Sequence, residues 1–366
     1  MRKLHVLVFL ISILSIEAQN VSSPSKTISL SFKLSSDGKP TYSVNYKTKA
    51  IVKESSLGIA IKESKSLETN FRIENIEQKS VNETWQPVLG EQSNIKNSYN
   101  EMTVVLSQPS TDRKMNIIFR VFDEGIAFRY EFPKQKNLNY FIISDEKSQF
   151  NLAENHKAFW IPGDYDSQEY AYNETKLSEI DNSKLDLNNG IGVKTIASSF
   201  RVQSPLMMKS ADGIYINVFE AAVVNYPIMH LDVDTKNFGL TSNLVPNAIG
   251  DKAYLQAPCV SPWRTIMMSD DAREIVSSKM ILNLNEPSKI EDTSWIKPMK
   301  YVGVWWEMHV GKSTWDYAGS QNAQNAADGD LKPSGKHGAT TENTKRYIDF
   351  AAKNGFDGVL VEGWNV

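Results

Sequence analysis

Three acidic residues stand close together in a stretch rich in aromatic side chains. Asp164, Asp166 and Glu169 lie in residues 160–170, which read WIPGDYDSQEY and include a Pro-Gly turn. Calcium takes about six to eight hard oxygen ligands, so these carboxylates could supply part of a calcium site. The spacing resembles the start of an EF-hand loop, although no glycine or distal glutamate follows in register. The alternative interpretation is a solvated acidic turn.

A second group of candidate residues lies near the end of the sequence. Glu362 follows the apolar residues 359–361 and precedes Trp364, while Trp305 and Trp306 stand earlier in the same region. A charge that closes an apolar strand is costly for stability, which favours a functional role. The tryptophan rings could stack on sugar rings. We therefore expect Glu362, Trp364 and Trp306 to contact substrate, with Glu362 as an accessory carboxylate; the alternative is that the tryptophans only cap a core.

The elements that carry this second group are predicted as strand, helix and strand. Residues 300–307 are expected to form a buried strand, 341–354 a helix and 358–365 a second strand. Polar and aromatic groups at the strand ends are typical of a (β/α)8 barrel, whose active sites lie at that face. From Pro298 onward the sequence holds 69 residues, whereas such a barrel needs about 250. We expect the chain to be the front portion of a larger enzyme.

Other residues carry a weaker signal. Glu307 ends the first of these strands and His309 follows it, in the same way as Glu362 on the second strand, but a lone His without a Ser, Cys or metal partner makes no site. Trp263 and Arg264 are expected in a loop at the edge of a sandwich.

The region before this unit alternates between apolar and polar residues. Residues 28–34 and 42–46 form one alternating pair, and residues 115–121 and 126–132 form another, each separated by a Gly-containing turn. Regular hairpins with one apolar face predict a large antiparallel sandwich. The pattern breaks near Pro287. We therefore predict a β-super-sandwich domain over residues 19–290 and the first, incomplete part of a (β/α)8 barrel over residues 291–366.

The N-terminus predicts export. Residues 1–18 carry Arg2 and Lys3, then an apolar run, then a small residue at a cleavage point, which is typical of a signal peptide. No later stretch is long and apolar enough for a membrane anchor. The single cysteine, Cys259, cannot form an internal disulfide and fits a bacterial periplasm. The net charge of −3 gives no reason to expect nucleic acid as a partner.

The combination of motifs resembles glycoside hydrolase family 97. The segments that carry the resemblance are 83–87, 128–133, 160–170, 262–265, 304–307, 346–352 and 358–365. The resemblance implies an N-terminal β-super-sandwich followed by a catalytic (β/α)8 barrel and a C-terminal β-domain. It also implies an active-site calcium ion with one carboxylate ligand from the N-terminal domain, at the position of Glu169. The remaining ligands, the general acid and the general base would lie on later barrel strands.

These features predict an N-terminal portion of an exported, calcium-dependent glycoside hydrolase that acts on α-glucan oligosaccharides. We expect an inverting α-glucosidase, in which an acid protonates the glycosidic oxygen while a base activates water. A retaining α-galactosidase of the same family is one alternative. A non-catalytic carbohydrate-binding or scaffold protein built on the sandwich is the other. The 366 residues by themselves are expected to be inactive, because the acid and the base are not among them.

Overall fold

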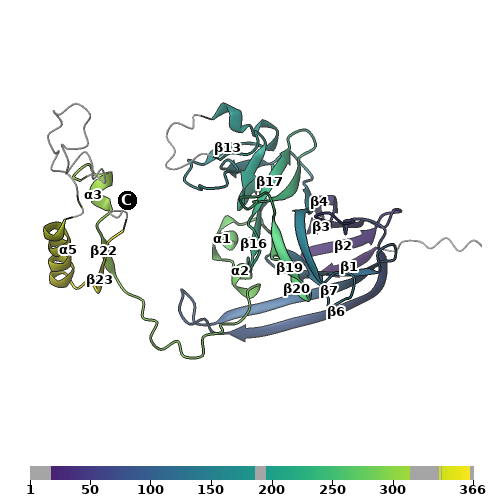
Figure 1. The fold of residues 1–366 in the computed structure, drawn as a ribbon, viewed down its shortest axis with the longest axis horizontal. Helices are drawn as coiled ribbons and strands as arrows, with labels where there is room; N and C mark the ends of the chain where they lie inside the picture. Colours follow the sequence, from purple (N-terminus) through teal and green to yellow (C-terminus); the bar gives the residue numbers. More distant parts are fainter. Residues whose placement is uncertain (1–17, 186–194, 314–337, 339, 363–366) are drawn as a thin grey trace, which may run out of the picture. The chain divides into compact units, whose positions relative to one another are not determined.

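The computed structural model describes residues 18–185, 195–313, 338 and 340–362 (Figure 1). The chain divides into two compact units. The first contains residues 92–287 together with the chain up to residue 87, and the second contains residues 88–91 and 288–366. The predicted signal peptide lies outside the described residues apart from Ala18. Among the described residues, no helix is both long and apolar enough to span a bilayer.

One large antiparallel sheet dominates the first unit. Its strands, in spatial order, are β13 (Asn173–Lys176), β12 (Lys157–Trp160), β15 (Leu206–Lys209), β16 (Tyr215–Ala221), β21 (Trp263–Ser269), β9 (Gly125–Phe132), β8 (Arg113–Phe122), β7 (Ile95–Gln108) and β6 (Arg72–Trp85), with β20 (Cys259–Val260) paired to β9. Figure 1 shows β6 and β7 running side by side as a long ribbon. The hairpin predicted from residues 115–132 is confirmed as β8 and β9.

Within the described part of the first unit, three smaller antiparallel sheets accompany the large one. The first consists of β1 (Gln19–Ser22), β2 (Ile28–Leu34), β3 (Pro40–Tyr46) and β4 (Lys49–Ser56). The second, in spatial order, consists of β19 (Ala253–Gln256), β10 (Tyr140–Glu146) and β5 (Ile59–Ile61). The third, in spatial order, consists of β11 (Gln149–Asn151), β18 (Gly239–Leu244), β17 (Met229–Asp234) and β14 (Arg201–Gln203). The unit is therefore mostly β-sheet, as the alternating pattern predicted.

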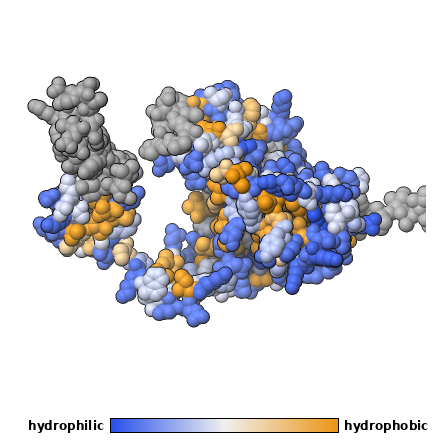
Figure 2. Space-filling model, viewed as in Figure 1, coloured by the Kyte–Doolittle hydropathy of each residue, from blue (hydrophilic) through white to orange (hydrophobic). Residues whose placement is uncertain are grey.

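Aromatic side chains join the β1–β4 sheet to the large sheet. Buried and half-buried residues alternate strictly along β2. The inward-facing Phe32 packs on Phe119 with 5.8 Å between ring centroids, and Tyr42 packs on Phe128 at 5.3 Å. All four rings are almost completely buried, and each contributes about 1.5–3 kcal/mol through the hydrophobic effect. The other face of β2 carries the half-buried Ser29, Ser31 and Lys33, whereas the other face of the large sheet packs a second buried cluster that includes Ile118, Ala127 and Trp263. Figure 2 shows hydrophilic side chains over much of the surface, with hydrophobic patches between them.

A buried ion network crosses the centre of the first unit. Arg264 on β21 is fully buried and donates to both carboxylate oxygens of Glu146, at 2.8 Å from Nε and 2.7 Å from Nη2. Its Nη1 also donates to Glu220. Tyr226 and Ser148 donate two further hydrogen bonds to Glu146, at 3.0 and 2.8 Å. The expectation of an edge loop at Trp263 and Arg264 is wrong, because β21 lies between β16 and β9 inside the large sheet.

Helices are short in the first unit. Its described helical segments are η1 (Leu177–Glu179), η2 (Asn182–Lys184), α1 (Ala272–Ser277) and α2 (Met280–Asn283). Asp271 caps α1 by accepting from the backbone N–H of Arg273 at 2.9 Å. The scarcity of helix follows from the period of two in the sequence.

The second unit contains a parallel strand pair. β22 (Tyr301–Gly303) pairs in parallel with β23 (Gly358–Leu360), and α5 (Thr341–Lys353) lies between them in sequence. Thr340 caps α5 through its hydroxyl, which accepts from the backbone N–H of Asn343 at 3.1 Å. The predicted order of strand, helix and strand is confirmed. The prediction that the second strand extends to residue 365 is wrong, because β23 ends at Leu360 and residues 361–362 lie outside it.

The first strand of this unit is shorter than predicted. The expectation of a buried strand through Glu307 is wrong, because β22 ends at Gly303 and the short helix α3 (Trp306–His309) follows. The carboxylate of Glu307 accepts hydrogen bonds from Asn343 and Arg346 on α5. These bonds hold Glu307 in α3, so the chain does not continue as an extended strand. Trp306 is 67% exposed, so it does not belong to a buried strand.

Candidate functional site

The loop between β12 and β13 carries the predicted calcium ligand Glu169. The loop spans residues 161–172 at the edge of the large sheet. The side chain of Glu169 is exposed, and its backbone N–H donates to the Ser167 hydroxyl at 3.1 Å. The Glu169 carboxylate therefore faces solvent, while the backbone next to it is held by the hydrogen bond to Ser167.

Asp164 is the anchor of that loop. Its Oδ1 accepts from the backbone N–H groups of Asp166 and Ser167, at 2.8 and 3.1 Å, and from the Thr195 hydroxyl at 2.8 Å. Its Oδ2 accepts from the Tyr170 hydroxyl at 2.6 Å and from the backbone N–H of Thr195 at 2.9 Å. Asp164 thus joins both ends of the segment 164–170 and ties it to the chain at Thr195.

The electrostatics of Asp164 match this role. The side chain is only 2% exposed. Burial by itself would raise the pKa of the carboxyl, but hydrogen bonds from Tyr170, from the backbone of Asp166 and from Thr195 outweigh it and lower the pKa to about 2. In return, burial and the bond to Asp164 raise the pKa of Tyr170 to about 12. The ionised carboxylate is therefore the state that organises the loop at neutral pH.

Arg201 on β14 supports the loop from the neighbouring sheet. Its Nε donates to Asp232 at 2.7 Å, and its Nη1 donates to the Tyr165 hydroxyl at 2.8 Å. Gly163 lies directly against this side chain, since a Cβ there would come within 2.5 Å of the Arg201 Cγ. The Gln203 amide adds hydrogen bonds to the carbonyls of Pro162 and Ser167, at 3.0 and 2.7 Å.

A buried imidazole lies under the same loop. His230 is 1% exposed and stacks on the Tyr165 ring with 5.9 Å between centroids and an interplanar angle of 19°. Neither ring nitrogen has a hydrogen-bond partner among the described residues. Burial, with the nearby Arg201 charge, lowers the pKa of His230 to about 4. The ring is therefore neutral at pH 7 and serves as a packing surface for Tyr165.

The structure separates the three acids that the sequence grouped as possible calcium ligands. Both Asp164 oxygens are occupied by donors, so this carboxylate is not free to bind a cation. Within the described residues, no group of three or more metal-binding side chains comes together. Asp166 and Glu169 are both exposed on this loop, and each offers a hard oxygen donor of the kind that calcium prefers. The calcium role of Glu169 stays a prediction.

The second predicted group lies partly within the described residues. Glu362 is exposed just after β23, and Trp306 is exposed at the start of α3. Trp364 lies outside the described residues. Burial by itself would raise the pKa of the Glu307 carboxyl, but the hydrogen bonds from Asn343 and Arg346 outweigh it, so the pKa lies below its usual value. Glu307 is thus held as a structural carboxylate, whereas the substrate contacts of Glu362, Trp364 and Trp306 stay predictions.

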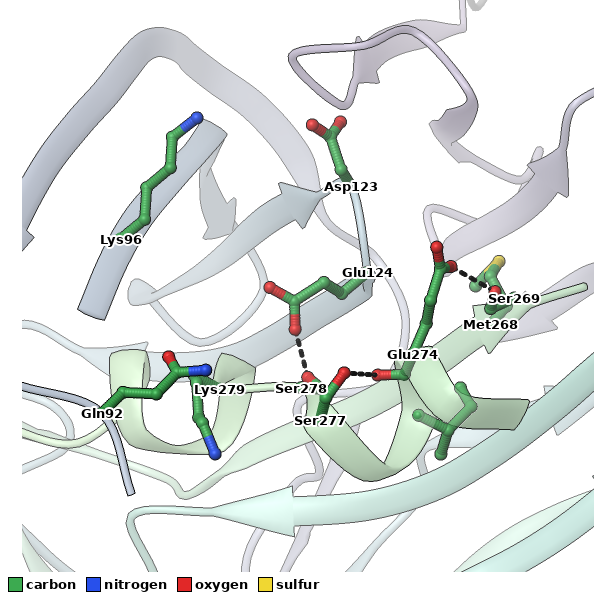
Figure 3. Close-up of a pocket in the computed structure, with 11 residues that line it drawn as sticks. Gln92, Lys96, Asp123, Glu124, Met268, Ser269, Glu274, Ser277, Ser278 and Lys279 are labelled. Carbon is green, nitrogen blue, oxygen red and sulfur yellow. Dashed lines mark hydrogen bonds between the residues drawn. The ribbon is translucent and has the colours of Figure 1, made fainter. Parts of the chain in front are cut away.

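A separate polar cavity of about 360 Å³ lies where the β8–β9 turn meets α1 (Figure 3). Figure 3 shows the Glu124 carboxylate directed to Ser278 and the Glu274 carboxylate directed to Ser269. Asp123, the third acid of the cavity, accepts from the backbone N–H of Ser25 at 2.8 Å. Asp123 and Glu124 therefore join the turn to Ser25 and Ser278, and Glu274 joins α1 to the end of β21, so all three acids have a structural role.

The sequence predicted a role for Glu169, which stays a prediction, but it did not indicate the residues that fix the loop around it. Thr195, Arg201 and His230 come from segments that lie 26–61 positions after Glu169, and no local pattern connects them to the loop. The Pro-Gly turn before Asp164 was the only local signal of a tightly bent backbone.

Comparison with known proteins gives a consistent result. Residues 21–287 match the family model for the glycosyl-hydrolase 97 N-terminal domain, and residues 305–366 match that for glycoside hydrolase 97. A family 97 enzyme from Pseudoalteromonas sp. strain K8, solved in complex with acarbose, is 36% identical with a TM-score of 0.79, over 95% of this chain and 48% of that chain. Its E480Q form with panose is 35% identical, with a TM-score of 0.78 and the same coverage.

A curated relative comes from Bacteroides thetaiotaomicron and is described as a retaining alpha-galactosidase. It is 24% identical over 89% of this chain and 47% of its own length. The chain thus spans about half the length of the relatives that it matches.

Proposed function

The chain belongs to glycoside hydrolase family 97, and we propose that the protein is an exported, calcium-dependent α-glucosidase that acts with inversion on α-glucan oligosaccharides. The observation that carries the proposal is the presentation of Glu169. An exposed carboxylate stands on a loop fixed by five hydrogen bonds to Asp164, which suits a preorganised cation ligand. A solvated acidic turn would not require such bracing.

Calcium, when bound, would supply positive charge and an oxygen-binding centre beside the substrate. Asp164 would keep the backbone of residues 164–170 in place, and Glu169 would contribute one anionic oxygen. Neutral His230 and the Arg201–Asp232 pair would support Tyr165 from below. The general acid and general base would come from residues outside this chain's described part, so no proton transfer is assigned to these side chains.

The α-glucosidic assignment is supported by relatives. The structures from Pseudoalteromonas sp. strain K8 hold acarbose and panose, and panose is a trisaccharide of α-linked glucose. Those relatives are 35–36% identical to this chain, whereas the curated alpha-galactosidase is 24% identical. The higher identity favours the glucoside-binding branch, and inversion is proposed as what the resemblance of the sequence motifs to that branch implies.

A retaining α-galactosidase is the second candidate, and the curated relative from Bacteroides thetaiotaomicron favours it. The distance between the two catalytic carboxyl groups would distinguish the two mechanisms. It is about 6.5–9.5 Å in inverting glycosidases and about 5–5.5 Å in retaining ones.

The second unit is proposed as the beginning of the catalytic (β/α)8 barrel. Its parallel pair β22 and β23, with α5 between them in sequence, has the order of one barrel repeat. At the rim of that barrel, Glu362, Trp364 and Trp306 would contact sugar.

The test uses protein produced from the complete gene. Turnover of p-nitrophenyl α-glucoside and α-galactoside is measured before and after calcium removal by chelation, and the anomer first released from maltose is identified by NMR. We expect glucoside turnover that chelation abolishes and added calcium restores, with inversion at the anomeric carbon. Turnover of the galactoside alone would establish the second candidate, and chelator-resistant turnover would refute the calcium role. Export to the periplasm is tested by cell fractionation.

A further inference from the structure

The outer face of the β19–β10–β5 sheet exposes two tyrosines. Along β10 and β19 the inward side chains Phe141 and Leu255 are buried, whereas Tyr140 is 72% and Tyr254 is 55% exposed. Tyr140 pairs with Gln256 across the two strands, so the tyrosines occupy diagonal positions on one face. Diagonal neighbours lie about 7–8 Å apart, within reach of one extended ligand.

The Tyr254 ring is fixed despite its exposure. Its hydroxyl donates to Asp251 at 2.6 Å and accepts from the Asn247 amide at 3.3 Å. Asp251 is itself 5% exposed and accepts from the Lys62 ammonium at 2.7 Å. A ring held by its hydroxyl with more than half its surface free loses little conformational entropy when a ligand binds.

The chemistry of the face identifies the class of ligand. The aromatic rings offer flat apolar surfaces, and Asn247, Gln256 and Lys62 offer exposed polar groups around them. The Lys62 ammonium is paired with the Asp251 carboxylate at 2.7 Å, so neither of these two charges is left free to attract an ion. A neutral ligand with apolar C–H faces and a rim of hydroxyl groups fits this combination, and a sugar chain is such a ligand.

We propose that this face is an auxiliary binding platform for α-glucan chains, on a different sheet from the Glu169 loop. The choice of glucan rests on the proposed function, whereas the platform rests on Tyr140 and Tyr254. Such a platform would hold long chains and would leave small substrates unaffected. It predicts binding that depends on chain length.

The test is native gel electrophoresis of the protein from the complete gene in gels that contain soluble amylopectin. The wild type is expected to be retarded, and the Tyr140→Ala/Tyr254→Ala double variant is expected to bind at least about tenfold more weakly. Tyr254→Phe, which removes only the hydroxyl bonds, should fall between them. Trp295→Ala is the matched control, because that side chain is 67% exposed but lies outside this sheet.

Circular dichroism checks that each variant folds, and turnover of p-nitrophenyl α-glucoside should be unchanged in the double variant. Absence of wild-type retardation, or equal retardation of the double variant, would overturn the platform. Retardation by galactomannan in place of amylopectin would overturn the choice of glucan. Failure of the proposed function would appear separately, as a lack of glucoside turnover, because that substrate is too small to need the platform.

Discussion

Asp164→Asn is expected to loosen the loop that presents Glu169. Lowering of the Asp164 pKa from 3.8 to about 2 on folding means that folding favours the ionised form by about 2 kcal/mol. Asparagine cannot reproduce this, because both carboxylate oxygens of Asp164 accept from donors. In one orientation the amide N–H₂ would face the backbone N–H of Thr195, and in the other it would face those of Asp166 and Ser167. We expect the free energy of unfolding to fall by about 2 kcal/mol at pH 7.

The stability difference between wild type and Asp164→Asn should depend on pH. A carboxyl whose pKa falls on folding stabilises the protein fully above its unfolded pKa of 3.8 and loses that contribution as pH falls through about 2. The difference between wild type and Asp164→Asn should therefore be largest at pH 5–7 and shrink towards about pH 2.

Urea denaturation of both proteins across this pH range measures the difference. Asp166→Asn is the matched control, since it makes the same change at an exposed carboxylate of the same loop. An Asp164→Asn difference below about 0.5 kcal/mol at pH 7, the usual range for surface substitutions, would refute the anchoring role. So would a loss no larger than that of Asp166→Asn.

Two further substitutions test the scaffold. Arg264→Met leaves two buried carboxylates without their cation and is expected to cost about 3–5 kcal/mol, measured by urea denaturation; a loss below about 1 kcal/mol would contradict the buried network. Gly163→Ala places a methyl group 2.5 Å from the Arg201 Cγ, so it should cost about 1–3 kcal/mol. Gly303→Ala, where nothing lies within 4 Å, is the control; equal melting temperatures for the two variants would show that Gly163 is not sterically required.

Local patterns predicted much of the fold. The alternation in residues 28–34 determines β2, because a period of two suits a strand with one buried face. The helix predicted over 341–354 is confirmed as α5, where the Thr340 hydroxyl caps the first turn. The end of β22 could not be predicted in this way, because it depends on a distant contact. Glu307 lies in α3 and accepts a hydrogen bond from Arg346 on α5, about 40 residues later.

In the candidate site, too, some features could be predicted from the sequence and others depend on the folded chain. Glu169 was predicted from the family resemblance and stays a prediction, whereas the role of Asp164 depends on Thr195, 31 residues away. An acid among acids looks like a metal ligand in sequence. Five donors, supplied only by the folded chain, make Asp164 an anchor.

Calcium titration calorimetry of the protein from the complete gene, as wild type and Glu169→Gln, tests the central claim most directly. Glutamine keeps the shape of the side chain and removes its charge, and the exposed position should leave the fold intact. The account predicts that the wild type binds calcium and that Glu169→Gln weakens binding by at least about tenfold, since affinity follows the charge of the ligands. Equal calcium affinity in both proteins, or no calcium binding by the wild type, would contradict it.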